Sequence, residues 1–278
     1  MSVNPAKGMG VSDFSWMRAM AGLGGWVWRQ WHELHHAAAV IGTVLIASVQ
    51  PRHWARPARK AFLRQLVAIG IEPLWFVGAV AVFVGISVVV QLTYWVGAAG
   101  QSQLLGPLLV AVVARELGPV LINLIVIVRS GSAITTELGL LKISDDASTQ
   151  EGPGRDPFSQ LVVPRVLGMV VSTFCLTTVF ILAAFASGYL FAAWMGIGNA
   201  DLLMFADTVS GAVQPKDVFN ILAKSLLPAL FAGASCCIGG LEIGGTFAEI
   251  PPATQRALTR SVAGLFVISA VVSLLTYM

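Results

Sequence analysis

Five long apolar stretches dominate the pattern of hydrophobic and polar positions along the chain. They cover residues 74–97, 104–128, 166–194, 218–239 and 262–277. A helix needs roughly 20 apolar residues to cross the hydrocarbon core of a bilayer, and each stretch meets or approaches that length. The shorter apolar run at 37–49 follows a segment rich in Trp and His, so we expect it to lie at the membrane interface. The pattern predicts an all-α integral membrane protein with about five transmembrane helices and an N-terminal interfacial helix.

The basic residues alternate between the two sides of these predicted spans. The segment before the first span and the segment between spans 2 and 3 are basic, whereas residues 98–103 carry no Lys or Arg and the loop between spans 3 and 4 carries only Lys216. Cytoplasmic loops are enriched in Lys and Arg, so we expect a cytoplasmic N-terminus and an external C-terminus. We divide the chain into an N-terminal cytoplasmic or interfacial segment, 1–65, and a transmembrane domain, 66–278.

The composition supports the membrane assignment and excludes an ordinary soluble domain. Charged residues make up 11% of the 278 residues and hydrophobic residues 56%. A soluble domain has about 25% charged residues. The net charge of +3 is modest, and no nucleic-acid partner is expected. The three cysteines lie in apolar stretches without metal-ligand spacing.

The second predicted span contains two adjacent charges, Arg115 and Glu116, followed by Leu117, Gly118 and Pro119. A charge at the bilayer centre costs about 2.5–3.5 kcal/mol on insertion scales, so both side chains need a partner or a wet cavity. Pro119 lacks an N–H and crowds the carbonyl of Arg115, which predicts a kink at the charged pair. The pair has two interpretations that can both hold: it binds a polar head group, and it is an internal Arg–Glu ion pair that fixes helix packing. Gln91 and Tyr94, near the outer end of span 1, are further candidates for ligand contact.

The second span ends in a segment of small and charged residues, 129–137. Small residues four apart, such as Gly131 and Thr135, let helix backbones approach closely. Arg129 and Glu137 lie on one helical face, and Arg129 is long enough to reach the head groups. Plain helix packing with charged ends explains the same pattern.

The segment 142–165 is the most polar part of the predicted cytoplasmic side. Ser144 with the acids after it is typical of a helix start, and Gly152, Pro153 and Gly154 should stop such a helix early. A short helix here is a candidate docking element for a soluble partner, and a solvated loop is the alternative. Its candidate coupling residues are Lys142, Ser144, Asp145, Asp146, Glu151, Arg155 and Asp156.

A zinc-protease pattern occurs near the N-terminus. His32, Glu33 and His36 match H-E-x-x-H, in which two histidines on one helical face hold Zn²⁺ and the glutamate is the general base. No third ligand is evident, so an interfacial Trp and His belt is the other interpretation. The chain has no Walker A motif, and therefore no ATP site of that kind.

Taken together, these motifs resemble the MlaE/YrbE permease family of bacterial ABC lipid transporters. The most specific are R-E-L-G-P at 115–119 and R-S-G-S-A-I-T-T-E-L-G at 129–139. The match begins at Arg64 and extends to the C-terminus. It also includes Gln91, Asp156-Pro157, Pro164-Arg165, Gly240-Leu241-Glu242 and the segment from Arg256 to Arg260.

The resemblance implies a homodimeric permease without cofactors or catalysis of its own, in the bacterial inner membrane. A separate ATPase subunit would bind ATP and Mg²⁺ and dock on a coupling helix within 142–156. A periplasmic MCE-domain protein, with or without a small STAS-type subunit, would complete the system, and phospholipid or another hydrophobic molecule would be the substrate. Gln91, Arg115 and Glu116 would face the lipid cavity. The matched residues Arg64, Arg129, Gly131, Glu137, Arg256 and Arg260 would have structural or interface roles.

The chain departs from the family in the coupling stretch. Residues 143–154 keep the family length but lose most of its apolar residues and gain two helix breakers. Three functions therefore stay open: an ATP-driven lipid permease, a degenerate permease that acts as a scaffold or passive lipid conduit, and a membrane-embedded zinc metalloprotease that uses His32, Glu33 and His36.

Overall fold

The computed structural model describes residues 41–43, 56–98, 105–144, 157–195, 202–244 and 246–278. Within these ranges the regular structure is helical throughout, and five helices are long and apolar enough to cross a membrane. The predicted all-α membrane protein with five spans is confirmed. Of the predicted interfacial run at 37–49, only residues 41–43 are described, and they are helical.

Each span is a long helix, and two of them contain wider π-helical turns. The first comprises α2 (Arg56–Leu66), the π-helical η2 (Val67–Ile71) and α3 (Leu74–Ala98). The second comprises α4 (Leu105–Leu109), π-helical η4 (Val110–Leu117), α5 (Gly118–Val126), π-helical η5 (Ile127–Gly131) and α6 (Ser132–Ile143). The third is α8 (Pro157–Trp194), the fourth is α10 (Pro215–Leu241), and the fifth is α11 (Ile250–Tyr277) after the short 3₁₀ turn η6 (Phe247–Glu249). The helix α9 (Leu202–Ala212) connects the third and fourth spans.

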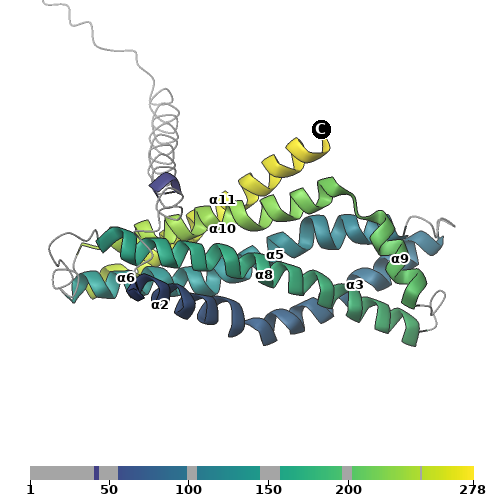
Figure 1. Ribbon diagram of the computed structural model, residues 1–278, viewed down its shortest axis with the longest axis horizontal. Coiled ribbons are helices and arrows are strands. Elements are labelled where there is room, and N and C mark those ends of the chain that lie inside the picture. Colours follow the sequence, from purple (N-terminus) through teal and green to yellow (C-terminus); the bar gives the residue numbers. More distant parts are fainter. Residues whose placement is uncertain (1–40, 44–55, 99–104, 145–156, 196–201, 245) are drawn as a thin grey trace, which may run out of the picture.

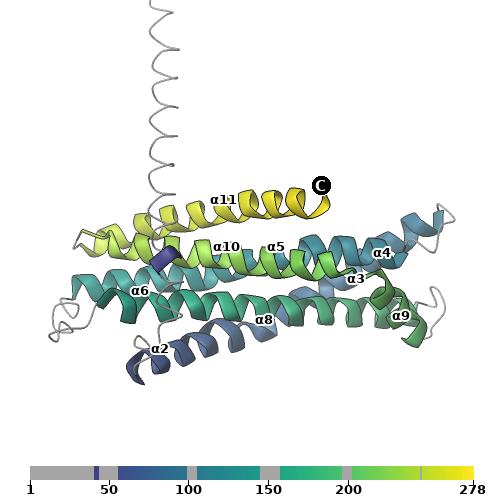
Figure 2. The same ribbon diagram turned by 45° about the horizontal axis from the view of Figure 1, so that its top comes forward.

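The spans lie side by side along the long axis of the molecule (Figures 1 and 2). α10 packs against α5, α6, α8 and α11, and α8 also packs against α2 and α3. α2 begins, α6 ends and α11 begins at one end of the bundle, which we call the basic end, and α9 lies at the other. α10 is therefore the helix through which the second, third and fifth spans are held together.

Glycine and threonine let the second span approach α10 closely, as predicted for Gly131 and Thr135. A Cβ atom added to Gly131 would lie 2.9 Å from Sγ of Cys236. The Thr135 hydroxyl lies 3.0 Å from the carbonyl oxygens of both Gly131 and Cys236, which share its single hydrogen. On the α10 side, a Cβ added to Gly240 would lie 2.8 Å from the Thr135 carbonyl oxygen. Larger side chains at these positions would push the two helices apart.

The helices extend beyond the apolar stretches from which they were predicted. The third span was expected to begin at residue 166, but α8 begins at Pro157 and contains Arg165. Arg165 Nη1 donates to the Leu161 carbonyl at 2.8 Å, and Nη2 lies 2.9 Å from Oε1 of Glu137. Because the charge is paired and hydrogen-bonded, the helix continues through it. Arg256 and Arg260, which precede the predicted fifth span at 262–277, likewise lie inside α11.

Several predictions fall on residues outside the described ranges. These include the zinc-protease pattern at His32, Glu33 and His36 and most of the coupling segment: Asp145, Asp146, Glu151, Arg155 and Asp156. Ser144, predicted to start a helix, is the C-terminal cap of α6 in the structure, with its hydroxyl 3.2 Å from the Leu141 carbonyl. The predicted domain boundary at 65/66 falls near the end of α2, which continues through η2 toward α3.

Candidate functional site

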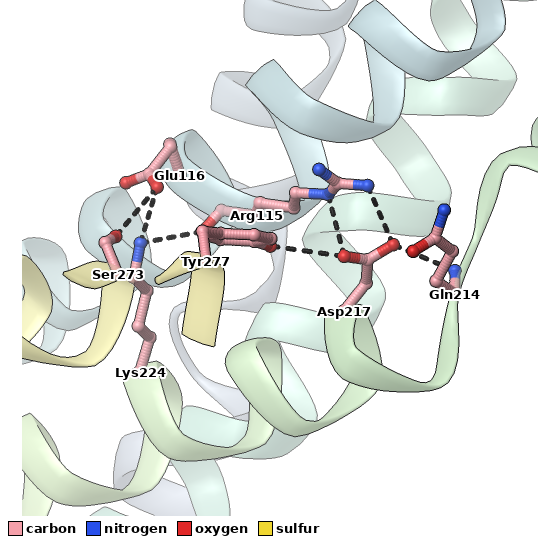
Figure 3. A network of polar contacts seen from close by, with 7 residues as sticks. All are labelled: Arg115, Glu116, Gln214, Asp217, Lys224, Ser273 and Tyr277. Atoms are coloured by element: carbon pink, nitrogen blue, oxygen red, sulfur yellow. Dashed lines mark hydrogen bonds and ion pairs between the residues drawn. The ribbon is translucent and has the colours of Figure 1, made fainter. Parts of the chain in front are cut away.

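Arg115 in η4 forms a two-point ion pair with Asp217 in the first turn of α10 (Figure 3). Nη2 donates to Oδ2 at 2.9 Å, and Nε lies 2.9 Å from Oδ1. The Asp217 side chain is completely buried, whereas that of Arg115 is 20% exposed. Two parallel contacts between a guanidinium and a carboxylate fix the relative orientation of the groups as well as neutralising them.

Glu116, the next residue, pairs with Lys224, which lies further along α10 than Asp217. Nζ of Lys224 on α10 lies 2.6 Å from Oε1 of Glu116, and the hydroxyl of Ser273 on α11 donates to the same oxygen at 3.0 Å. The Lys224 side chain is completely buried, whereas that of Glu116 is 51% exposed. The adjacent charges of the second span thus do not pair with each other, and each finds its partner on α10. The predicted internal Arg115–Glu116 ion pair is wrong.

The proline after the charged pair explains why this backbone can accept Lys224. η4 is π-helical, and the N–H of Gly118 bonds to the Val113 carbonyl, five residues back. Pro119 has no N–H for the Arg115 carbonyl, which a regular helix would pair with it. Nζ of Lys224 donates to that Arg115 oxygen at 3.2 Å. The expected release of a backbone carbonyl beside the charged pair is therefore present, and Lys224 satisfies it.

Tyr277 and the start of α10 complete the surroundings of Asp217 (Figure 3). The Tyr277 hydroxyl donates to Oδ1 at 3.1 Å, and the Gln214 backbone N–H donates to Oδ2 at 2.8 Å in a capping box. The Arg115 guanidinium lies 5.2 Å from the centre of the Tyr277 ring, within cation–π range. Both carboxylate oxygens of Asp217 are thus fully used, and the carboxylate is a fixed anchor for Arg115.

Glu116, in contrast, borders an open hollow of about 350 Å³ between the second and fifth spans. Ser269 and Ser273 contribute hydroxyls to its wall, and Leu117, Val120 and Phe266 contribute apolar surface. Oε2 of Glu116 has no hydrogen-bond partner among the described residues. The hollow therefore combines one free carboxylate oxygen with an apolar wall, which suits a ligand that has a hydrogen-bond donor or cation at one end and a hydrocarbon part at the other.

Not all the candidate substrate-binding residues come together within one chain. Arg115, Glu116 and the buried Pro119 lie at the site just described. Gln91 and Tyr94 are exposed on α3, which packs against α8 and α4, and neither lines the hollow beside Glu116. Their role in binding stays a prediction.

The other predicted positions lie on segments that lead to or from the basic end. Lys142 Nζ donates to the Leu241 carbonyl at the end of α10, so Lys142 ties the second span to the fourth. Arg129 pairs with Glu72 at 3.1 Å, and Glu137 pairs with Arg165. Arg256 and Arg260 line a small pocket of about 100 Å³, and Arg64 lines a larger cleft beside α2.

The sequence analysis missed the partners of the charged pair, namely Asp217, Lys224, Ser273 and Tyr277. Asp217 directly precedes the predicted fourth span, 218–239, and so falls in the predicted external loop, but in the structure it belongs to the first turn of α10 and is buried. A signal was present, because Lys224 lies inside an apolar stretch and Asp217 precedes it by two helical turns on the same face. The second span carries one positive and one negative charge, and so does this part of the fourth span. Because buried charges need partners of opposite sign, the two spans can pair with each other.

The described residues contain no group of three or more His, Cys, Asp or Glu side chains arranged to hold a metal ion. The pattern at 32–36 lies outside them and stays untested.

Comparison with known proteins decides the family. The model of the family described as "Permease MlaE" matches residues 62–275. The chain belongs to this family. The relatives of this MlaE-family chain include an intermembrane phospholipid transport system permease protein of Haemophilus influenzae, 26% identical over 75% of this chain and 81% of that protein. A probable ABC transporter permease of Synechocystis is 27% identical over 75% of the chain and 79% of its own length.

A third relative comes from a chloroplast. The protein TRIGALACTOSYLDIACYLGLYCEROL 1 of Arabidopsis thaliana is 27% identical over 84% of this chain, which spans only 65% of the plant protein's length. The resemblance inferred from the motifs at 115–119 and 129–139 is thus confirmed at the level of the family.

Proposed function

We propose that this chain is the membrane subunit of an ABC transporter that moves phospholipid or another hydrophobic molecule between the inner and outer membranes, driven by a separate ATPase. The family supports a permease. The names of two relatives, an intermembrane phospholipid transport permease and a probable ABC transporter permease, support the substrate class and the transporter type.

The observation that carries the proposal is the half-exposed carboxylate of Glu116 inside a membrane-spanning helix, at the edge of a hollow with apolar walls. A charge that faced hydrocarbon would be costly, so the exposed side of Glu116 faces a polar or wet space. A lipid has the matching chemistry, with a polar head group for Glu116 and acyl chains for Phe266 and Val120. Arg115 and Lys224 hold Glu116 in place through the contacts with α10.

The second copy of the chain completes the cavity in this proposal. The hollow beside Glu116 is open, and Gln91 and Tyr94 are exposed on α3, so a homodimer would bring further surface to the lipid. The dimer would lie in a bacterial inner membrane. Its N-terminus and the basic end of the bundle would face the cytoplasm.

The ATPase would dock at the basic end and would bind the ATP and Mg²⁺. Its contact would involve the segment 142–156, whose loss of apolar residues predicts an interface different from the usual family contact. A periplasmic MCE-domain protein would continue the lipid path on the other side, and a small STAS-type subunit is a further candidate partner.

The experiment is lipid transfer by the purified transporter. The tagged chain is isolated with the proteins that accompany it, reconstituted into donor liposomes with a fluorescent phospholipid, and assayed for ATP-dependent transfer to acceptor liposomes. We expect Glu116→Gln to reduce transfer at least tenfold, because it removes the carboxylate charge at the hollow. The matched control is Glu72→Gln, which removes another half-exposed, ion-paired carboxylate of a membrane-spanning segment, away from the hollow.

Each outcome discriminates among the functions. Transfer that requires ATP and Glu116 supports the proposal. Transfer that is equal with and without ATP contradicts the ATP-driven mechanism and favours a passive conduit. Wild-type transfer by Glu116→Gln contradicts the assignment of the head-group site.

A further inference from the structure

A second cleft lies at the basic end of the bundle, between α2, α6 and α8, and we call it the α2 cleft. Its volume is about 410 Å³, and it is lined by Lys60, Ala61, Arg64, Gln65, Glu137 and Arg165. It shares no residue with the hollow beside Glu116. The lipid-transport proposal leaves it unused.

The α2 cleft has an excess of positive charge. Three of its lining residues are cationic and one, Glu137, is anionic, which leaves two positive charges. Glu137 is already paired with Arg165 at 2.9 Å. Within the described part of the chain, neither Lys60 nor Arg64 forms an ion pair. An anion would supply the missing negative charge.

Arg165, at the wall of this cleft, has one buried donor without a partner. Its side chain is only 8% exposed. Its Nη1 donates to the Leu161 carbonyl and its Nη2 forms the ion pair with Glu137, but its buried Nε has no hydrogen-bond partner in the described structure. Leaving a buried donor without a partner costs about 1–3 kcal/mol, more for a charged group, so a water or ligand atom that reached this nitrogen would be stabilised.

The position of the cleft suits a lipid head group. Lys60 and Arg64 are four residues apart on α2, and Leu63 and Val67, also four apart, lie next to them, with 51% and 49% of their surface exposed. Charged and apolar surface thus adjoin on one helix that leads into the first span. α2 is held against α8 at Gly168, where an added Cβ would lie 2.8 Å from Cβ of Gln65.

We propose that the α2 cleft binds the phosphate group of an anionic phospholipid from the surrounding leaflet, as a site separate from the transport cavity. Arg64 and Lys60 contact the phosphate oxygens, and the acyl chains lie along Leu63 and Val67. Arginine and lysine are the usual partners of phosphate, and arginine offers two parallel donors. The bound lipid offsets one of the two uncompensated positive charges of the cleft and holds α2 at the membrane surface.

The test measures retention of lipid by the purified full-length chain in detergent. The protein is titrated with dioctanoyl phosphatidylglycerol, and bound lipid is counted by native mass spectrometry. Arg64→Gln removes one phosphate contact and should weaken binding about tenfold, and Arg64→Lys should recover part of it. Arg59→Gln is the matched control, because Arg59 is an exposed cation of the same helix that does not line the cleft. Arg64→Gln should weaken binding by the same factor in a Glu116→Gln background, because the two sites share no residue.

The possible results are distinct. Equal weakening by Arg64→Gln and Arg59→Gln would show a diffuse charge effect and overturn the proposal, as would loss of binding only in Glu116→Gln. Displacement of the lipid by inorganic phosphate at millimolar concentration would identify a soluble phosphate site and overturn the lipid as occupant. Selective loss in Arg64→Gln without phosphate competition establishes the site.

Discussion

The ion pair between Glu116 and Lys224 predicts an unusual order of stability among its variants. Glu116 is half-exposed and Lys224 is completely buried, so removing the more exposed residue should destabilise the protein more. Glu116→Ala leaves the Lys224 ammonium inside the bundle with the Arg115 carbonyl as its remaining partner. Breaking a buried ion pair in this way costs about 3–5 kcal/mol.

Removing the lysine should cost less. Lys224→Met keeps a long apolar side chain of similar volume in the buried position. Glu116 then has no ion-pair partner, but it keeps the hydrogen bond from Ser273. Its carboxylate borders the open hollow, so its negative charge is not buried. The main loss is the donor to the Arg115 carbonyl, which is worth about 1–3 kcal/mol. The double variant should resemble Lys224→Met, because the buried ammonium is gone. It should therefore be more stable than Glu116→Ala by about 2 kcal/mol, which is the difference between the two single losses.

The assay is reversible unfolding of the purified protein by SDS in mixed micelles, followed by tryptophan fluorescence and by helical circular dichroism. The four proteins of the cycle are compared at one pH and one ionic strength. Equal losses in the two single variants, or a double variant whose loss is the sum of both, would refute the reasoning, since either result means that Glu116 does not compensate the Lys224 charge.

Two further predictions use the same unfolding assay. Gly240→Ala should destabilise by about 1–3 kcal/mol because its Cβ would lie 2.8 Å from the backbone oxygen of Thr135, whereas Gly78→Ala, with no atom within 4 Å, should be neutral or stabilise by up to about 1 kcal/mol. A stable Gly240→Ala protein would contradict the close packing of α10 on α6. Arg129→Ala should cost about 1 kcal/mol or less, because Arg129 and Glu72 are 44% and 57% exposed, and a larger loss would show a further role for this pair.

The five spans were predictable because hydrocarbon imposes a strong length and polarity pattern on the sequence. Their ends were less predictable. Arg165 and Arg256 look like loop residues in a hydropathy pattern, but in the structure each donates to a carbonyl four residues back in its own helix, and Arg165 also pairs with Glu137. The apolar pattern indicates which residues avoid water. It does not indicate which charged side chains have hydrogen-bond or ion-pair partners in the folded protein.

The sequence predicted the charged residues of the candidate site on the second span but not their partners on other helices. Arg115, Glu116 and Pro119 stand out because they break an apolar stretch, and the freed carbonyl of Arg115 follows from the chemistry of proline. The identity of the partners depends on which helices pack together, and α10 contacts the second span only in the folded bundle. Asp217 illustrates this limit. Asp207 and Asp217 both lie between the third and fourth apolar stretches, and the sequence pattern does not distinguish them. In the structure Asp207 is exposed and Asp217 is completely buried.

The pairing of Lys224 with Glu116 also has a consequence for how the chain enters the membrane. An unpaired lysine in the fourth span would oppose insertion by about 2.5–3.5 kcal/mol. Its counter-charge is 108 residues earlier in the chain. At about 5–20 residues per second, the ribosome makes Glu116 roughly 5–20 seconds before Lys224. We expect the second span to be in the bilayer already when the fourth arrives, so that the order of synthesis provides each buried charge with its partner at the moment of insertion.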